Sequence, residues 1–180
     1  MPTEAKGRQR RFWFGLVAIF LLALSVRLSR PASKYTVWYE RSAQFWDALR
    51  RGDWAGTYQR HHPGVTTMWI AGSGMRLYLA AQGQPASEMR DLPAKWPSPQ
   101  GPPVRAGVTA MAVTLALSIV GAYALLFRTN GWPTAFVAGW LLALDPFHIT
   151  HSNMIHVDAL LSVFMLLSAL FLINYLGRGA

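Results

Sequence analysis

The sequence predicts an all-α integral membrane protein with about four transmembrane helices and an outer loop that carries amphipathic juxtamembrane helices. The first observation is composition. Hydrophobic residues make up 52% of the 180 residues and charged residues only 14%, whereas average soluble chains carry about 25% charged residues. The second is a set of long uncharged runs, and the third is a long segment between the first two runs in which aromatic residues recur at helical spacing.

The first apolar run, Phe12–Val26, is uncharged for 15 residues and follows a basic segment at 1–11 that holds four Lys or Arg residues. At about 1.5 Å per residue it is short for a hydrocarbon core of about 30 Å. We expect a transmembrane helix over 12–28, with Arg27 extending its charge to the interface so that Leu28 joins the span. A cleaved signal peptide is the alternative, because a basic start precedes a short apolar run.

Three further runs predict the remaining helices. Gly107–Phe127 holds 21 uncharged residues, Gly131–Leu144 holds 14, and Ala159–Gly177 holds 19. We expect transmembrane helices over 106–127 and 157–177. The run of 14 could be re-entrant on its length alone, and extending it over 132–147 brings it close to spanning length, with an outer turn at 148–156.

The basic residues at 1–11 predict a cytoplasmic N-terminus for this multi-pass chain. Four crossings then place the segment 29–105 outside. This outer loop is itself basic, but it is longer than the short loops to which the charge rule applies.

The outer loop contains two segments with helical patterns, near 38–51 and 63–81. The first places apolar residues on one side and a polar stripe on the other, as expected for an amphipathic helix on a membrane surface. The apolar side holds Trp38, Phe45, Trp46 and Leu49, and the polar stripe holds Glu40, Gln44, Asp47 and Arg51. The second segment has small residues at Thr67, Ala71 and Gly74, which predict close helix packing. A Pro- and Gly-rich stretch then predicts an irregular connection to Arg105.

The formal charge of +9 arises from 17 Lys and Arg against 8 Asp and Glu. Because the basic residues are scattered beside apolar runs, we expect membrane lipid or a phosphorylated substrate as partner and no nucleic acid. The chain has no cysteine, which excludes disulfides and thiol chemistry.

Two segments could carry chemistry. His61-His62-Pro63-Gly64 precedes the second loop helix, and a helix start led by proline offers free N–H groups to an anion. An ordinary helix start with solvated histidines is the alternative, and position alone favours it because helix starts led by proline are common.

The second segment, 144–161, places five titratable residues between two apolar runs: Asp145, His148, His151, His156 and Asp158. Such residues at a membrane boundary suggest function. They could perform acid–base work or bind a metal, although the spacing matches no standard zinc motif. They could also form a polar boundary loop, with Asp158 simply placing a negative charge at a helix N-terminus.

Three ordered motifs carry a family resemblance. They are Trp38-x-x-Arg41-Ser42-x-x-Phe45 with Gly52-Asp53; His62-Pro63-Gly64-Val65-Thr66-Thr67-Met68-Trp69; and Leu144-Asp145-Pro146-Phe147-His148-x-x-His151-Ser152 followed by His156-x-Asp158-Ala159-Leu160. Together they resemble the N-terminal part of a GT-C class membrane glycosyltransferase, nearest to bacterial relatives of the protein O-mannosyltransferases and the lipid A aminoarabinose transferases.

The resemblance implies transfer of a sugar from a polyprenyl-phosphate carrier to an acceptor on the outer face of a bacterial plasma (inner) membrane. A carboxylate acts as base towards the acceptor, and basic groups steady the departing phosphate. The catalytic candidates are Asp158, His62 and Glu40. The candidates for substrate binding are Arg105, His151, His148 and Arg41. No cofactor and no metal are expected.

The chain departs from the family at two places. The acidic pair expected in the outer loop is replaced by Lys34 and Tyr35, and Asn153 stands where many relatives carry arginine. Because the sequence stops at Ala180, we expect a truncated or degenerate copy that needs a missing C-terminal portion or another membrane chain, so enzymatic activity is left open. The alternatives are a non-enzymatic small membrane protein that binds lipid or a partner through its basic Trp-rich loop, and a metal-binding membrane protein that uses His148, His151 and Asp158.

Overall fold

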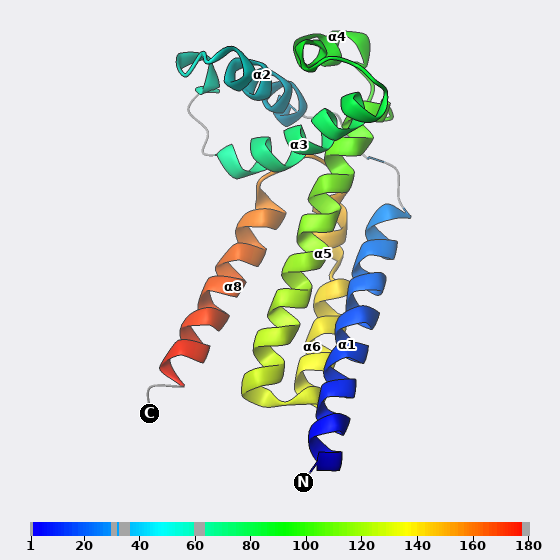
Figure 1. Ribbon diagram of the computed structural model, residues 1–180, viewed down its shortest axis with the longest axis vertical. Coiled ribbons are helices and arrows are strands. Elements are labelled where there is room, and N and C mark those ends of the chain that lie inside the picture. The colour runs from blue at the N-terminus through cyan, green and yellow to red at the C-terminus, as the bar shows by residue number, and fades with distance from the viewer. Residues whose placement is uncertain (1, 30–31, 33–36, 60–63, 178–180) are drawn as a thin grey trace.

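The computed structural model describes residues 2–29, 32, 37–59 and 64–177, and over these residues it is helical with no strand. Long helices form a bundle, and shorter helices cover one end of it (Figure 1). The bundle consists of α1 (Pro2–Leu28), α5 (Pro102–Asn130), α6 (Trp132–Ala143) and α8 (Asp158–Leu176). The covering elements are α2 (Val37–Arg51), η1 (Ala55–Thr57), α3 (Val65–Ala81), η2 (Ala86–Asp91) and α4 (Leu92–Lys95), and α7 (Pro146–Ser152) joins α6 to α8.

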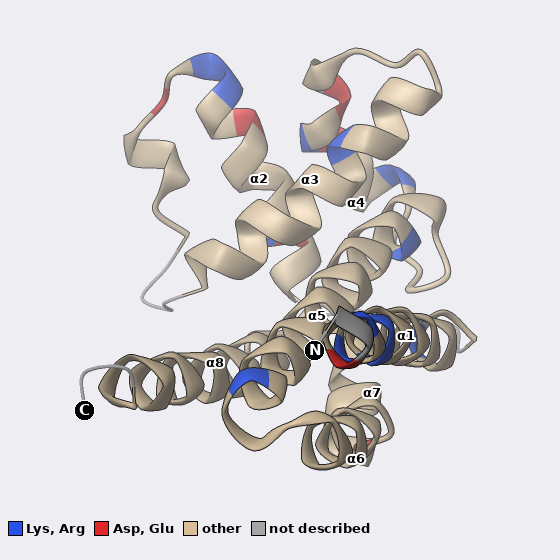
Figure 2. Cartoon of the chain, turned by 60° about the horizontal axis from the view of Figure 1, so that its bottom comes forward, with Lys and Arg blue, Asp and Glu red and all other residues tan. Residues whose placement is uncertain are grey.

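The capped end of the bundle is where α1 finishes and α5 and α8 begin, under α2, α3 and α4 (Figure 1). The basic end is where α1 begins, α5 finishes and α6 begins, and Lys and Arg residues of α1 and α5 lie there (Figure 2).

Three helices are long and apolar enough to cross a membrane: residues 4–28 of α1, all of α5 and all of α8. They indicate a membrane protein. The expected third span over 132–147 is not found as one helix, because α6 covers only 12 residues and ends at Ala143. Leu144, Asp145 and Pro146 interrupt the helix, since the Asp145 side chain accepts a hydrogen bond from the backbone N–H of His148 and thereby starts α7.

Three other boundaries differ from the sequence-based expectation. The basic residues at 1–11 belong to α1, which is helical from Pro2 onwards. Helix α5 begins at Pro102, so Arg105 lies in its first turn and not in an irregular connection. Most of the expected turn at 148–156 is the short helix α7.

Helix α5 joins the two parts of the fold. Near the capped end its buried residues Val108 and Met111 belong to one apolar cluster with Met68 and Met75 of α3. Farther along, its buried residues belong to a second cluster with α1 and α6, for example Ile119 against Ile19. The single helix α5 therefore packs against both the covering helices and the helices of the bundle.

The apolar side of α2 packs inside the protein, whereas the sequence suggested that it lies on a membrane surface. Trp38 and Phe45 are buried, and the Trp46 indole N–H donates to the Met68 carbonyl of α3 at 3.2 Å. A Cβ atom added at Gly72 of α3 would collide with the Trp46 indole. The tryptophans of α2 thus occupy space that glycine leaves open next to α3.

The polar side of α2 contains the expected helical ion pair. Asp47 Oδ2 lies 3.0 Å from Arg51 Nε, and Asp47 Oδ1 lies 3.0 Å from Arg50 Nη2. Asp47 is itself buried, and two arginines one turn ahead satisfy its carboxylate.

Arg27 does not extend to the interface as expected, because it is buried at the capped end with 1% of its surface exposed. Its Nη1 atom donates to the carbonyls of Ala23 in α1 and Ala143 in α6, at 2.9 and 3.1 Å. Ala143 is the last residue of α6, so one of these two carbonyls has no partner within its own helix.

A substitution at Gly74 tests the expected close packing of the small residues of α3. A Cβ atom at Gly74 would collide with the Ala106 carbonyl oxygen of α5 and lie 2.9 Å from the Ala110 Cβ atom. We therefore expect Gly74→Ala to lower the free energy of unfolding by about 1–3 kcal/mol, despite its gain in helix propensity. Thermal unfolding of the detergent-solubilised chain measures this change.

Gly121→Ala is the matched control, because it gains the same propensity within α5 and its Cβ atom would lie 3.4 Å from the Leu167 side chain, an ordinary contact. Equal effects of the two substitutions would contradict close packing at Gly74.

Candidate functional site

The polar corner between α6, α7 and α8 holds most of the titratable residues that the sequence singled out. Asp145 precedes α7, and its Oδ1 atom accepts from the backbone N–H of His148 at 2.8 Å. His148 and His151 belong to α7, while Asp158 is the first residue of α8. Because α7 and α8 contact each other at the capped end, this corner lies beside the end of α1 that holds Arg27.

His148 lies at the centre of this corner. Its Nδ1 atom is 3.0 Å from Asp145 Oδ1, and its Nε2 atom is 3.0 Å from the Ser162 hydroxyl of α8. Burial lowers the pKa of His148, and the positive charge of Arg27 lowers it further, while the Asp145 carboxylate opposes both effects. The imidazole is therefore neutral at pH 7, and one ring nitrogen is able to accept a proton or a hydrogen bond.

Asp158 forms the second part of the corner with two histidines. Its Oδ2 atom lies 3.1 Å from His156 Nδ1 and 3.9 Å from His151 Nε2. The side chain is 46% exposed, so the carboxylate is accessible from outside the protein. His151 is oriented from its other ring nitrogen, because Nδ1 lies 2.9 Å from the Phe147 carbonyl oxygen. A carboxylate placed in this way is able to accept a proton from an incoming nucleophile and to share it with an imidazole.

Two arginines line a cavity at the capped end, between α1 and α5. The cavity has a volume of about 460 Å³, and its polar lining includes Arg27, Ser29, Gln100, Arg105 and Thr109. Within the described part of the chain, the Nε and Nη2 atoms of Arg27 are buried and have no hydrogen-bond partner. Arg105 is exposed. Guanidinium groups, hydroxyls and an amide are the donors expected for a phosphate or another oxyanion.

Arg27 connects the cavity with the polar corner. It lines the cavity beside Arg105, and it donates to Ala143, two residues before Asp145. Its positive charge reaches His148 strongly enough to lower the pKa of that histidine. A negative charge in the cavity would therefore act electrostatically on the histidine of the corner.

The two candidate residues on α2 do not line the cavity between α1 and α5. Glu40 and Arg41 are half-buried in its first turns. The Arg41 guanidinium carbon lies 4.8 Å from the centre of the Trp38 ring, a cation–π contact. His62, Lys34 and Tyr35 lie outside the described residues, as do His61 and Pro63.

Sequence reasoning missed Arg27, Ser162 and Thr109 as members of these sites. Arg27 gave a signal, because an ionisable residue at the end of an apolar run suggests function by default. Ser162 and Thr109 gave none, since hydroxyl residues are common in apolar helices and the sequence does not reveal which helix faces which.

The described residues contain no group of three or more His, Asp and Glu side chains placed to hold a metal ion. The metal-binding alternative based on His148, His151 and Asp158 has no support in this arrangement, because His148 is directed to Asp145 and Ser162 while Asp158 is directed to His156.

Comparison of the chain with protein-family models, curated proteins and solved structures finds no match.

The lowered pKa of His148 predicts how acid affects the protein. In the unfolded chain a histidine has a pKa near 6.5, and in the folded chain the pKa of His148 lies below that value. The unfolded state therefore binds more protons in mild acid, and stability falls as the pH drops below about 6.5. We expect His148→Gln to reduce the loss of melting temperature between pH 7.5 and pH 5.5, measured by thermal unfolding in detergent.

His156→Gln is the control, since the His156 side chain is 34% exposed and that of His148 is 12% exposed. If the two substitutions change the pH dependence equally, the buried imidazole of His148 is not its source.

Proposed function

We propose that this chain takes part in the transfer of a sugar from a polyprenyl-phosphate carrier to an acceptor at the outer face of a bacterial plasma membrane. In this proposal it supplies the N-terminal helices and the outer loop of a GT-C type glycosyltransferase. The observation that carries the proposal is the cavity lined by Arg27 and Arg105, which lies at the same end of the bundle as the Asp158 corner. The order of the sequence motifs supports the same function.

The cavity suits the carrier phosphate. In an inverting transfer, a bond forms between the acceptor oxygen and the sugar C1 atom while the bond from C1 to the phosphate oxygen breaks. The bonding electrons remain on the phosphate, whose negative charge increases. Arg105 and Arg27 would stabilise that charge, because guanidinium groups form charge-assisted hydrogen bonds with phosphate oxygens. Ser29 and Thr109 add hydroxyl donors at the same cavity.

The acceptor proton needs a base. Asp158 is our candidate, since its carboxylate is partly exposed and two imidazoles flank it. Glu40 is a second carboxylate on α2, at the same end of the molecule. His148 is neutral and close to Arg27, and it would respond to the charge of the carrier phosphate rather than take the acceptor proton.

A second candidate function is a non-enzymatic membrane protein that binds lipid or a partner through its cap. Large aromatic side chains on the cap favour it: Trp54 is 74% exposed and Tyr58 is 68% exposed. Exposed aromatic residues of this size are common where proteins meet membranes or other proteins. Sugar transfer that depends on Asp158 would decide against this candidate.

Carrier binding is the first test. We expect the purified chain to bind a polyprenyl phosphate more tightly than the matching polyprenol, and Arg105→Gln to weaken phosphate binding about tenfold or more, because a hydrogen bond to a charged group contributes about 1.5–3 kcal/mol. Native mass spectrometry or a fluorescence titration in detergent measures both affinities.

Arg90→Gln is the control for Arg105→Gln, since it removes the same charge from an exposed position of the cap that does not line the cavity. Equal binding of polyprenol and polyprenyl phosphate, or equal loss in the two variants, would contradict a carrier-phosphate site.

Transfer itself is the second test. We expect membranes that contain the chain together with the portion that completes the enzyme to move labelled sugar from polyprenyl-phosphate carriers to envelope material. Asp158→Asn should reduce this transfer at least about tenfold, within the range typical for a general base. Asp91→Asn, which changes an exposed acid of η2, should have no effect. Undiminished transfer by Asp158→Asn would remove Asp158 from the mechanism.

A further inference from the structure

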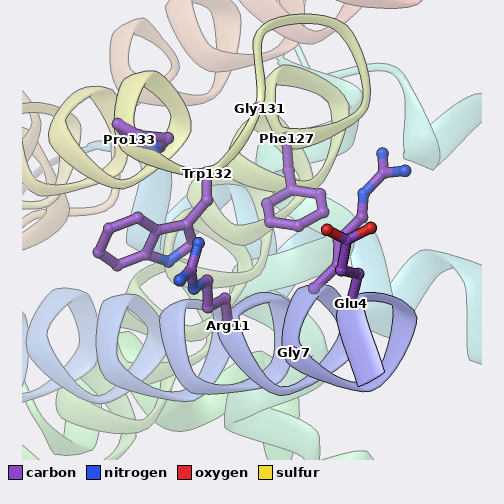
Figure 3. A pocket seen from close by; sticks show the side chains of 8 residues that line it. Glu4, Gly7, Arg11, Phe127, Gly131, Trp132 and Pro133 are labelled. Carbon is purple, nitrogen blue, oxygen red and sulfur yellow. The ribbon is translucent and has the colours of Figure 1, made fainter. Parts of the chain in front are cut away.

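A second cavity lies at the basic end of the bundle, opposite the cap. It has a volume of about 600 Å³ and is formed by the start of α1, the end of α5 and the start of α6 (Figure 3). Glu4, Arg8 and Arg11 of α1 line one side, and Phe127 and Trp132 line the other. None of these residues belongs to the site described above.

The two arginines rest on aromatic rings. The Arg8 guanidinium carbon lies 5.6 Å from the centre of the Phe127 ring. The Arg11 guanidinium carbon lies 5.9 Å from the centre of the Trp132 ring, and Figure 3 shows these two side chains next to each other. Among the described residues, neither arginine forms an ion pair. A guanidinium that rests on a ring keeps its N–H groups free at the edge. Both cations are therefore positioned by the protein and able to donate to an anion.

Trp132 adds a donor that also lacks a partner. Its indole Nε1 atom is buried and forms no hydrogen bond within the described part of the chain. A buried N–H group without a partner costs free energy. The Trp132 side chain lines the cavity, so a shift of its ring would bring the N–H group to an acceptor bound there.

The height of the cavity along the bundle points to a lipid headgroup. The uncharged run of α1 starts at Phe12, one residue after Arg11, and the apolar part of α5 ends at Phe127, before Arg128. At this height Trp13 is 54% exposed and Phe14 is 62% exposed, so α1 presents large apolar side chains to its surroundings. The hydrocarbon core therefore begins at the cavity, where phospholipid phosphates and interfacial tryptophans lie.

The charge of the cavity suits a phosphodiester. Arg8, Arg11 and Glu4 together leave one net positive charge, which matches the single negative charge of a phosphatidylglycerol headgroup. Two guanidinium groups and an indole N–H supply donors for its phosphate oxygens. The Glu4 carboxylate would repel a more highly charged anion such as free phosphate.

We infer that this cavity binds the phosphate of an anionic phospholipid headgroup, with Arg8, Arg11 and the Trp132 indole N–H as donors. This inference does not depend on the proposed sugar transfer, because it concerns the opposite end of the bundle. Such a lipid would bridge α1, α5 and α6 at the membrane surface.

Lipid retention by the full chain tests the inference. In a neutral detergent, native mass spectrometry should find phosphatidylglycerol retained about tenfold more than phosphatidylcholine. Arg8→Gln with Arg11→Gln should reduce that retention about tenfold or more, as expected when charged hydrogen bonds are removed. Lys6→Gln with Arg10→Gln is the matched control, since it removes the same charge from exposed positions of α1 that do not line the cavity.

Trp132→Phe separates lipid binding from a structural role. The substitution keeps an aromatic ring but removes the indole N–H group together with the five-membered ring that carries it. Retention of phosphatidylglycerol should fall several-fold, because the variant loses one hydrogen bond to a charged acceptor. The melting temperature without lipid should fall only by the ring packing that is lost, because the removed N–H donor has no partner in the lipid-free chain.

Three results would overturn the inference. They are equal retention of phosphatidylglycerol and phosphatidylcholine, equal loss in the two double variants, and displacement of phosphatidylglycerol by millimolar inorganic phosphate. The last result would assign the cavity to a free phosphate ion instead of a lipid.

Discussion

The length of α5 is the constraint on which the other elements depend. Its 29 residues extend about 43 Å at about 1.5 Å per residue, whereas the hydrocarbon core of a bilayer is about 30 Å thick. The helix is therefore longer than the hydrocarbon core, and α3 packs against its first turns, where Gly74 of α3 and Gly107 of α5 let the two helices approach closely. Helices α1, α6 and α8 contact the rest of α5. The position of the cap over the bundle is therefore determined by this one continuous helix.

The helical patterns in the sequence predicted that the outer segment contains helices, but not what covers their apolar sides. The spacing of Trp38, Phe45 and Trp46 defines one side of a helix, and a membrane surface or another helix could cover it equally well. The structure places α3 there. The deciding residues are Gly64 and Gly72, whose missing side chains leave room for the Trp38 and Trp46 rings. The sequence alone does not show which side chain fills the space that a glycine leaves open.

The candidate site was predicted more fully in its residues than in its geometry. The sequence placed His148, His151 and Asp158 together because five titratable residues lie between two apolar runs. It expected one transmembrane helix to continue over 132–147, whereas Asp145 ends that continuity by capping α7. The break turns His148 towards Ser162 and next to Arg27. Contacts across 116 residues of sequence, such as that from Arg27 to Ala143, cannot be inferred from local pattern.

Hydrogen bonds to backbone carbonyls fix the position of α1 at its capped end and towards its basic end. Near the basic end, the Tyr123 hydroxyl of α5 lies 3.3 and 3.1 Å from the carbonyl oxygens of Arg11 and Phe12, and Gly15 leaves room for its ring. At the capped end, Arg27 donates to Ala143 of α6. In apolar surroundings water does not compete for such bonds, so each restrains the helix more than an exposed bond would. Both cavities border α1 beside these restraints. The arginines that face each cavity are thus carried by backbone whose position is already determined before any anion binds, which lowers the entropic cost of binding.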